Sequence, residues 1–163
     1  MVKVPKYTPK KGGVTADEVP EGKQPAVIKD VSVETKQREK RYWDKKLKAR
    51  VVELDQYGAP VMEDYQLLRI DYELTDISGE PTIGQWCGLS MNPGDKDGNM
   101  RSNLYKNAIA LDEVPETGDD LDTDRFIGRE VEIDIVHKTV GDTTWANVSG
   151  PIVRALDTHQ RRL

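Results

Sequence analysis

Residues Tyr65–Asp76, YQLLRIDYELTD, carry the clearest secondary-structure signal in the chain. Apolar side chains recur there at every second position, and this period of two is typical of a β-strand with one buried face. The apolar set is Leu68, Ile70, Tyr72 and Leu74, and the set on the other face is Leu67, Arg69, Asp71 and Glu73. The stretch therefore predicts a strand that lies on a core, with charged side chains outside.

Other stretches extend this pattern on both sides. Ala26–Thr35 is rich in β-branched residues and predicts a strand with Val27, Val31 and Val33 on one side. Thr82–Met91 predicts another strand, with Ile83, Cys87 and Leu89 on one face and Trp86 on the opposite face. Leu47–Val51 also alternates. As a strand it would turn three apolar residues to the core and align the cations Lys46, Lys48 and Arg50 outside.

The last part of the chain predicts a helix followed by a hairpin. Ser102 can cap a short helix over Asn103–Leu111. Within Phe126–Val153, apolar residues alternate from Val131 to Ile135, and Gly141-Asp142 marks a hairpin turn. We therefore expect a mainly β fold with five or six short strands. A barrel of the oligonucleotide-binding type suits this order, because a helix commonly precedes its last two strands, although other small Greek-key or up-and-down barrels also fit.

Length and composition indicate one such domain with short appendages. The chain has 163 residues, a formal net charge of −5 and 33% charged residues. Residues 1–25 contain four prolines and several lysines and predict an extended basic arm, residues 26–155 form the barrel domain, and residues 156–163 form a short basic tail. No apolar run approaches the roughly 20 residues that span a bilayer. We expect a cytoplasmic protein, since a single cysteine excludes an internal disulfide.

The most basic segment is Lys36–Arg50, KQREKRYWDKKLKAR, which holds eight basic residues against two acidic ones. Tyr42 and Trp43 lie inside it. Lysine and arginine follow phosphates while aromatic rings stack on bases, so the segment predicts a surface for single-stranded nucleic acid. A solvated charged face is the alternative. Trp86 lies between Gly84 and Gly88, which would leave its ring uncrowded as a stacking platform, or it packs beneath a loop or helix.

An acidic segment, Asp112–Asp124, contains seven acidic residues and no basic one. It can be a metal cluster, a mimic of nucleic-acid charge or a solubilising loop, and we favour the loop because runs of like charge are usually solvated. His137, His159 and Cys87 are too dispersed for a structural zinc site, so neither a metal nor a cofactor is expected.

Three motifs resemble the phage-encoded single-stranded DNA-binding proteins and related phage proteins. They are QLLRIDYELTD at Gln66–Asp76, SNLYKNAIALDE at Ser102–Glu113 and FIGREVEIDIVHKTVGDTTWANVSG at Phe126–Gly150. The resemblance spans roughly Val27 to Val153. It implies the oligonucleotide-binding barrel, single-stranded DNA as the ligand and a place in replication or recombination. Two features depart from the pattern: residues 36–64 are longer than it requires, and the chain ends in a basic tail. Recruitment of replication proteins would then fall to the acidic segment at 112–124.

These patterns define the expected site. Phosphates would be held by Lys36, Arg38, Lys40, Arg41, Lys45, Lys46, Lys48 and Arg50, and bases would stack on Tyr42, Trp43 and Trp86. No nucleophile–base arrangement, phosphate-binding glycine loop or paired-histidine motif is visible, so we expect a protein that is not an enzyme. The alternative function is a phage structural or assembly protein whose basic arm docks on an acidic partner.

Overall fold

The computed structural model describes residues 13–157, so residues 1–12 of the expected N-terminal arm and residues 158–163 of the expected basic tail lie outside the described residues. The elements in chain order are β1 (Val14–Thr15), β2 (Gly22–Glu39), β3 (Arg41–Asp44), β4 (Ala49–Val52), β5 (Met62–Leu74), β6 (Thr82–Gly88), α1 (Asn103–Ala110), the 3-10 helix η1 (Thr123–Phe126), β7 (Glu130–Val140), β8 (Thr143–Val148) and β9 (Arg154–Ala155). The fold is mainly β with one α-helix before the closing β7–β8 hairpin, which confirms the expected class. None of the described helices has the length and apolar character needed to cross a membrane.

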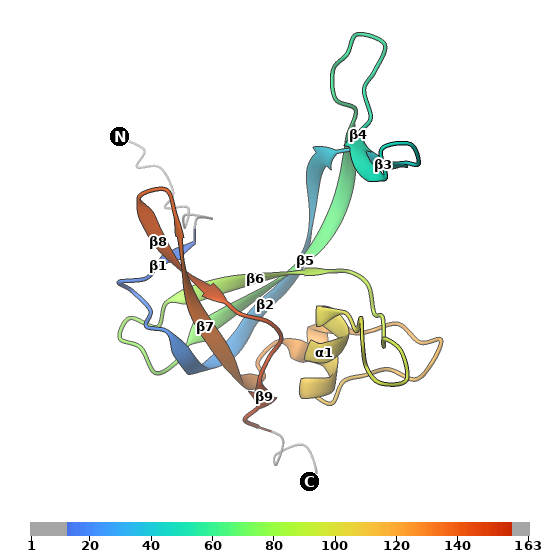
Figure 1. Cartoon of the computed structure of the whole chain (residues 1–163). Coiled ribbons are helices and arrows are strands. Elements are labelled where there is room, and N and C mark those ends of the chain that lie inside the picture. The colour runs from blue at the N-terminus through green and yellow to red at the C-terminus, as the bar shows by residue number, and fades with distance from the viewer. Residues whose placement is uncertain (1–12, 158–163) are drawn as a thin grey trace, which may run out of the picture.

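Seven of the strands form one antiparallel sheet, and β3 and β4 form a second, two-stranded sheet (Figure 1). The large sheet has the order β1-β8-β7-β2-β5-β6, and β9 pairs with the start of β7 on the same edge as β8, opposite β2. Within the described residues no ladder joins β6 to β8, so the sheet is not closed into a barrel. The strand pairing therefore does not form the expected closed barrel of five or six strands.

The central strand β2 is interrupted by a bulge between Ile28 and Asp30. Before the bulge Ala26 and Ile28 are buried, and after it Val31 lies opposite the buried Ile70. The extra residue reverses the alternation, because side-chain direction has a period of two. Val27 consequently faces away from Val31, and the expectation that Val27, Val31 and Val33 share one side is wrong.

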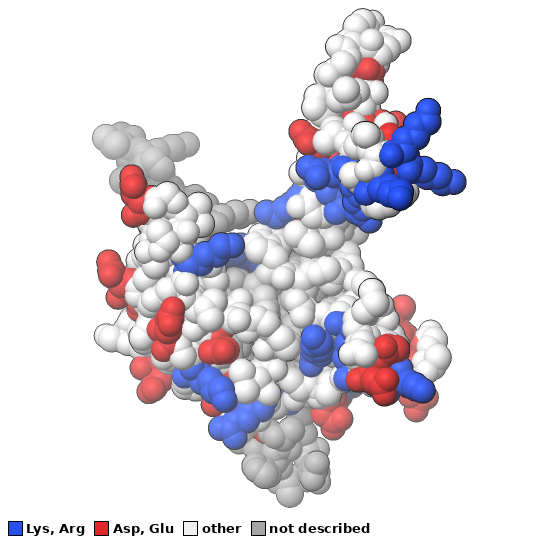
Figure 2. Space-filling model, in the orientation of Figure 1, with Lys and Arg blue, Asp and Glu red and all other residues white. Residues whose placement is uncertain are grey.

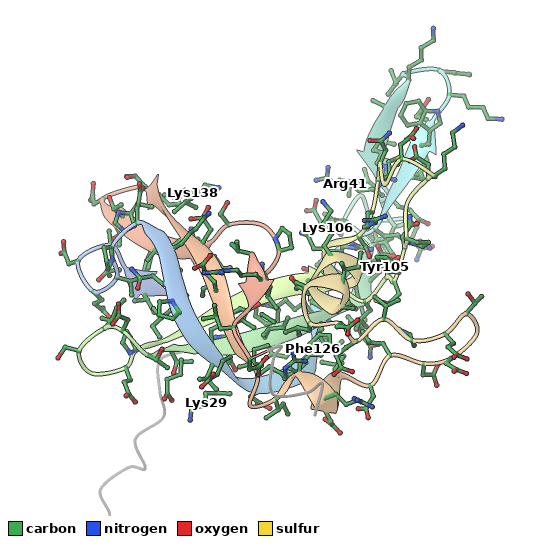
Figure 3. The ribbon with its side chains drawn as sticks, turned by 90° about the horizontal axis from the view of Figure 1, so that it is seen from below. Lys29, Arg41, Tyr105, Lys106, Phe126 and Lys138 are labelled. Atoms are coloured by element: carbon green, nitrogen blue, oxygen red, sulfur yellow. The ribbon has the colours of Figure 1, made fainter. Side chains whose placement is uncertain are left out.

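The core lies between the curved sheet and the short helix. From α1, Leu104 and Ala108 are buried together with Leu111, as the helical spacing predicts. Ser102 is the N-cap, and its hydroxyl accepts a hydrogen bond of 3.2 Å from the backbone N–H of Tyr105. Phe126, at the end of η1, is fully buried and closes this side of the core (Figure 3).

Polar side chains bridge the side of the sheet between β6 and β8. Gln85 on β6 donates a hydrogen bond to the carbonyl of Gly150, which follows β8, and accepts one of 2.9 Å from the hydroxyl of Tyr72. From α1, Asn107 accepts a hydrogen bond of 2.8 Å from the backbone N–H of Ile152. Tyr72, Gln85, Asn107 and Ile152 are buried, and side chains rather than a ladder connect the two ends of the sheet.

The outer halves of β2 and β5 run beyond the core and end in the β3–β4 hairpin (Figure 1). We call this feature, residues 36–65, the protrusion. The expected strand Leu47–Val51 is wrong in its first half, since residues 45–48 form a turn and β4 begins only at Ala49. The carboxylate of Asp44 accepts hydrogen bonds from the backbone N–H groups of Lys46 and Leu47, which closes the turn. Leu47 is 68% exposed, and the expected row of cations along one strand face is not formed.

Candidate nucleic-acid interface

Strand pairing brings cations and aromatic rings together on one face of β2, β5 and β6. Lys36 on β2 lies opposite Tyr65 on β5, and Arg69 on β5 lies opposite Trp86 on β6. Residues paired across an antiparallel ladder share a face, so these side chains and Arg38 lie on the side of the three strands that faces away from the core. We call this surface the outer face.

On the outer face the cations lie directly over the rings. Lys36 Nζ is 4.1 Å from the centroid of the Trp86 ring, and Arg69 Cζ is 5.1 Å from the same centroid. Arg38 Cζ is 4.5 Å from the centroid of the Tyr65 ring. Such contacts are attractive because the ring face is electron-rich. Trp86 keeps 36% of its surface exposed, so a flat ligand that stacks on it competes with Lys36 for the ring.

The glycines beside Trp86 behave differently from each other. A Cβ placed on Gly84 would lie 2.7 Å from Nη2 of Arg69, whereas one placed on Gly88 would meet nothing within 4 Å. The guanidinium of Arg69 therefore fills the space that Gly84 leaves, and Asp71 holds it there through an ion pair of 2.8 Å. The expectation that both glycines leave the ring uncrowded is correct for Gly88 alone.

Tyr42 and Trp43 are solvent-exposed on β3, with 50% and 60% of their surfaces accessible. They pair with Val51 and Arg50 of β4. Because the two aromatic residues are consecutive in one strand, they point to opposite faces of the hairpin. A strand of nucleic acid that lies along one face of the hairpin can therefore stack on one of these rings, while the other ring faces away.

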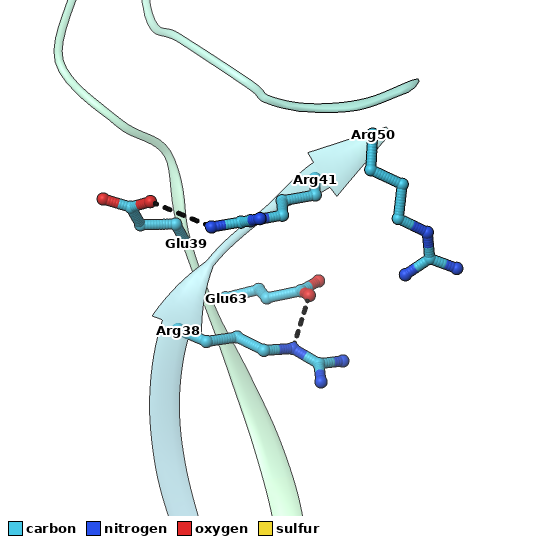
Figure 4. A pocket seen from close by; sticks show the side chains of 5 residues that line it. All are labelled: Arg38, Glu39, Arg41, Arg50 and Glu63. Atoms are coloured by element: carbon cyan, nitrogen blue, oxygen red, sulfur yellow. Dashed lines mark hydrogen bonds and ion pairs between the residues drawn. The ribbon is translucent and has the colours of Figure 1, made fainter. Parts of the chain in front are cut away.

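The base of the hairpin holds a pocket of about 230 Å³ (Figure 4). Its lining residues are Arg38, Glu39, Arg41, Arg50 and Glu63. Arg38 pairs with Glu63 at 2.9 Å and Arg41 approaches Glu39 at 3.9 Å, whereas Arg50 has no ion pair among the described residues. Exposed ion pairs stabilise a protein by about 0–1 kcal/mol, so a phosphate group can replace either glutamate as the partner of an arginine.

The remaining expected cations lie on the hairpin itself, where basic side chains gather in Figure 2. Lys40 pairs with Glu53 at 3.4 Å, while Lys45, Lys46 and Lys48 lie in the exposed turn between β3 and β4. The structure thus brings Arg38, Arg41 and Arg50 together at the base of the hairpin and places Lys36 over Trp86. The lysines of the turn are separated from Trp86.

Arg69 and Tyr65 were not identified from the sequence as site residues. Alternation places Arg69 on the outward side of its strand, and this is the only signal the sequence offers. The contact with Trp86 depends on the register between β5 and β6, which sequence alone does not give.

The acidic segment at 112–124 is partly built into the fold. Glu113 forms ion pairs with Arg125 at 2.9 Å and with Arg129 at 3.4 Å, and its side chain is almost fully buried. In residues 13–157 no three His, Cys, Asp or Glu side chains are arranged to hold a metal ion. Glu113 is therefore a structural residue, and Asp122 caps η1 by accepting a hydrogen bond of 3.1 Å from the backbone N–H of Asp124.

The single cysteine, Cys87, is a poor nucleophile in this fold. Burial raises the pKa of the Cys87 thiol to about 11, although a hydrogen bond from Asn107 Nδ2 at 3.6 Å acts in the opposite direction. At neutral pH the thiol is protonated, and the thiol is a much weaker nucleophile than the thiolate.

Comparison with known proteins gives no family for the chain. No protein-family model matches it, and no curated protein matches its sequence. The resemblance to phage single-stranded DNA-binding proteins consequently stays a prediction. The outer face and the protrusion are therefore the surfaces from which a function can be inferred.

Proposed function

We propose that the protein binds single-stranded DNA without catalysing a reaction, and that it acts in phage replication or recombination in the host cytoplasm. The observation that supports this best is the pair of cations over an exposed ring, Lys36 and Arg69 on Trp86. Surfaces that bind single strands combine positive charge along the backbone with aromatic rings beneath the bases. The outer face offers both the charge and the ring, because Lys36 and Arg69 are in contact with Trp86.

The strand connections support a second part of the proposal, a partly open barrel of the oligonucleotide-binding type. The pairs β2–β5, β5–β6, β2–β7 and β7–β8 occur with α1 between β6 and β7. If β2 is the first barrel strand, β5 and β6 are the second and third. Barrels of this type bind oligonucleotides on the face of those two strands and on the adjacent loops. The outer face and the protrusion occupy these positions.

The proposed binding step is an exchange of partners at Trp86. A base that stacks on the ring displaces the ammonium group of Lys36, which is then free to pair with the phosphate of the same nucleotide. The arginines at the base of the hairpin would hold neighbouring phosphates, with Arg50 the first to do so because it has no ion pair to break. Each stacked base contributes about 1–3 kcal/mol.

A titration of fluorescently labelled oligo-dT at several salt concentrations tests the proposal. We expect Trp86→Ala to weaken binding by about 1–3 kcal/mol with an unchanged salt dependence. Arg50→Gln should lower the slope of log affinity against log salt by about 0.7, the contribution of one phosphate on a single strand. Trp145→Ala is the matched control, because that ring lies on β8 against Gly13 and outside the outer face. Absence of binding at low salt would reject the proposal.

A second candidate function is a structural or assembly protein of a phage. It is favoured by apolar side chains exposed on the protrusion, among them Leu47 and Tyr57, the latter 84% exposed. On this account the protrusion, the acidic segment at 112–124 or the basic arm would contact other proteins. Stable complexes that are indifferent to added oligo-dT would favour this candidate over DNA binding.

A further inference from the structure

The outer half of β2 has an edge without a partner strand. On one side β2 pairs with β5 as far as Glu39, but on the other side β7 reaches only Val27. Among residues 13–157, no strand pairs with the second edge over Asp30–Glu39. A long exposed edge presents a row of backbone N–H and C=O groups and is a template for pairing with another chain.

The backbone groups on this edge can be assigned by residue. Lys40 donates its N–H to the carbonyl of Val61 on the β5 side, whereas Val31 donates its N–H to the side chain of Asp30. The register with β5 is regular from Asp30 to Glu39, so backbone direction alternates throughout. The residues that direct N–H and C=O to the open edge are Val31, Val33, Thr35, Gln37 and Glu39.

We propose that two copies of the chain associate by pairing these edges, antiparallel, about a two-fold axis at Thr35. Thr35 then lies opposite Thr35 of the second copy, Glu34 lies opposite Lys36, and Lys36 lies opposite Glu34. Thr35 is at a position joined by backbone hydrogen bonds, whereas Glu34 and Lys36 are at positions not joined by them, where side chains approach most closely. Ser32 and Arg38 face each other in the same register.

The charge pattern selects this register over its neighbours. Moving the axis to residue 34 places Glu34 opposite Glu34, and moving it to residue 36 places Lys36 opposite Lys36. Like charges directly opposite each other destabilise a ladder, whereas opposite charges contribute roughly 0.2–1 kcal/mol per pair. Edges that only avoid aggregation commonly carry lysine, which repels in every register. With the axis at residue 34, two Asp30–Arg38 pairs attract but Glu34 repels itself, and with the axis at residue 36, two Glu34–Arg38 pairs attract but Lys36 repels itself. Of these three registers, only the axis at Thr35 gives attractive pairs over Asp30–Lys40 with no like charges opposite each other.

The occupant of the edge is therefore a second copy of this chain. A two-fold axis perpendicular to the sheet joins β5 and β6 of both copies into one continuous sheet and leaves both outer faces on the same side. This dimer does not require DNA, because the two copies pair through backbone groups and charges of β2 itself.

Sedimentation equilibrium of the full chain without nucleic acid tests the inference. The unmodified protein should show a reversible monomer–dimer equilibrium. Glu34→Lys alone and Lys36→Glu alone should each weaken dimerisation by on the order of tenfold, because two attractive pairs become repulsive. An equimolar mixture of the two variants should form heterodimers, since every pair at the interface is then complementary again.

Lys46→Glu is the control with the same change of charge as Lys36→Glu, in the exposed turn of the hairpin, and should dimerise like the unmodified protein. Gln37→Pro removes an N–H from the open edge and leaves the ladder with β5 intact, so it should give a folded monomer by circular dichroism and sedimentation. A monomeric unmodified protein, undiminished dimers of both single variants, or a mixture that stays monomeric would each overturn the proposal.

Discussion

At the scale of single residues, the contacts of Arg129 and Asp157 hold the end of the described chain to the sheet. Arg129 Nε donates to the carboxylate of Asp157 at 3.0 Å, and Arg129 Nη1 donates to the carbonyl of Leu111 at 3.0 Å. The backbone N–H of Glu130 also donates to Asp157, at 2.9 Å. Both charged side chains are nearly buried. Removing one partner of such a pair leaves a buried charge uncompensated and costs several kcal/mol.

This pair predicts a loss of stability in acid. Burial opposes ionisation of Asp157, but the hydrogen bonds from Arg129 and Glu130 outweigh it, so the pKa of this carboxyl is lowered. An unfolded aspartate has a pKa of about 3.9. The unfolded state therefore binds the proton more readily, and the free energy of unfolding should decrease as pH falls from about 4 through the lower folded pKa.

Urea unfolding followed by circular dichroism over this pH range is the measurement. The variant Asp157→Asn should be less stable at neutral pH. Its free energy of unfolding should also decrease less between neutral and acidic pH, that is, it should show a flatter acid limb than the unmodified protein. The matched variant Asp142→Asn changes an exposed aspartate of the β7–β8 turn and should keep the original acid limb. Identical acid limbs for the Asp157 variant and the unmodified protein would show that the pair does not link pH to folding.

Side-chain direction was predictable from sequence where one face of a strand is buried. Leu68, Ile70 and Tyr72 lie in the core because their alternation leaves no other arrangement. The same reasoning failed for Lys46 and Lys48, since the carboxylate of Asp44 offers nearby N–H groups a local alternative to a strand. No core contact opposes that turn.

At the scale of elements, the protrusion is distinct from the core although it is made of the same strands. The buried apolar residues of β2 end at Ile28, and those of β5 begin at Leu68. Between these two, only the partly buried Val31 packs against the core, and it lies outside the protrusion. The protrusion is held by the ladder between β2 and β5 and by exposed ion pairs, each of which stabilises it only slightly.

We therefore predict that residues 41–60 can be replaced by Asn-Gly, a two-residue hairpin turn that joins Lys40 to Val61, because the backbone N–H of Lys40 already donates to the carbonyl of Val61. The thermal midpoint measured by circular dichroism should change little, because no buried side chain is removed. Affinity for oligo-dT and its salt slope should both fall, because Arg41, Arg50 and the lysines of the turn are lost. Leu68→Ala is the contrasting variant and should cost about 2–5 kcal/mol. A comparable loss of stability from the excision would contradict a separate protrusion.

The sequence indicated that residues 36–64 are longer than a barrel requires, but it did not indicate how they fold. Their charged composition explains why: a hairpin with no buried face has no apolar period that could be recognised. The bulge in β2 was hidden for a related reason, because Val27 and Val31 look equivalent in sequence and only pairing with β5 and β7 separates them.

At the scale of the whole molecule, polar side chains connect the two ends of the sheet. Tyr72 on β5, Gln85 on β6 and the carbonyl of Gly150 form a hydrogen-bonded chain across the side between β6 and β8. Asn107 adds a second connection from α1 to Ile152. The side chains of Tyr72, Gln85 and Asn107 are buried, so their hydrogen bonds replace those that water would make and maintain the curvature of the sheet.

We predict that Gln85→Leu lowers the free energy of unfolding by about 1–3 kcal/mol, because the hydroxyl of Tyr72 and the carbonyl of Gly150 lose a buried partner. Adding Tyr72→Phe should recover part of this loss, since the unpaired hydroxyl is then removed. A double-mutant cycle by urea unfolding measures the coupling. Strictly additive effects would show that the two side chains act independently.

The continuity of β2 and β5 between the core and the hairpin has a mechanical consequence. Tension applied at the tip runs along both strands at once, so it does not pull them apart from each other. The force is transmitted to the rest of the molecule through the ladder between β2 and β7 and the ladder between β5 and β6, and in both it acts parallel to the strands. Many hydrogen bonds resist such sliding at the same time. A force applied at the tip would therefore extend the protrusion before it separated β2 and β5 from the rest of the sheet.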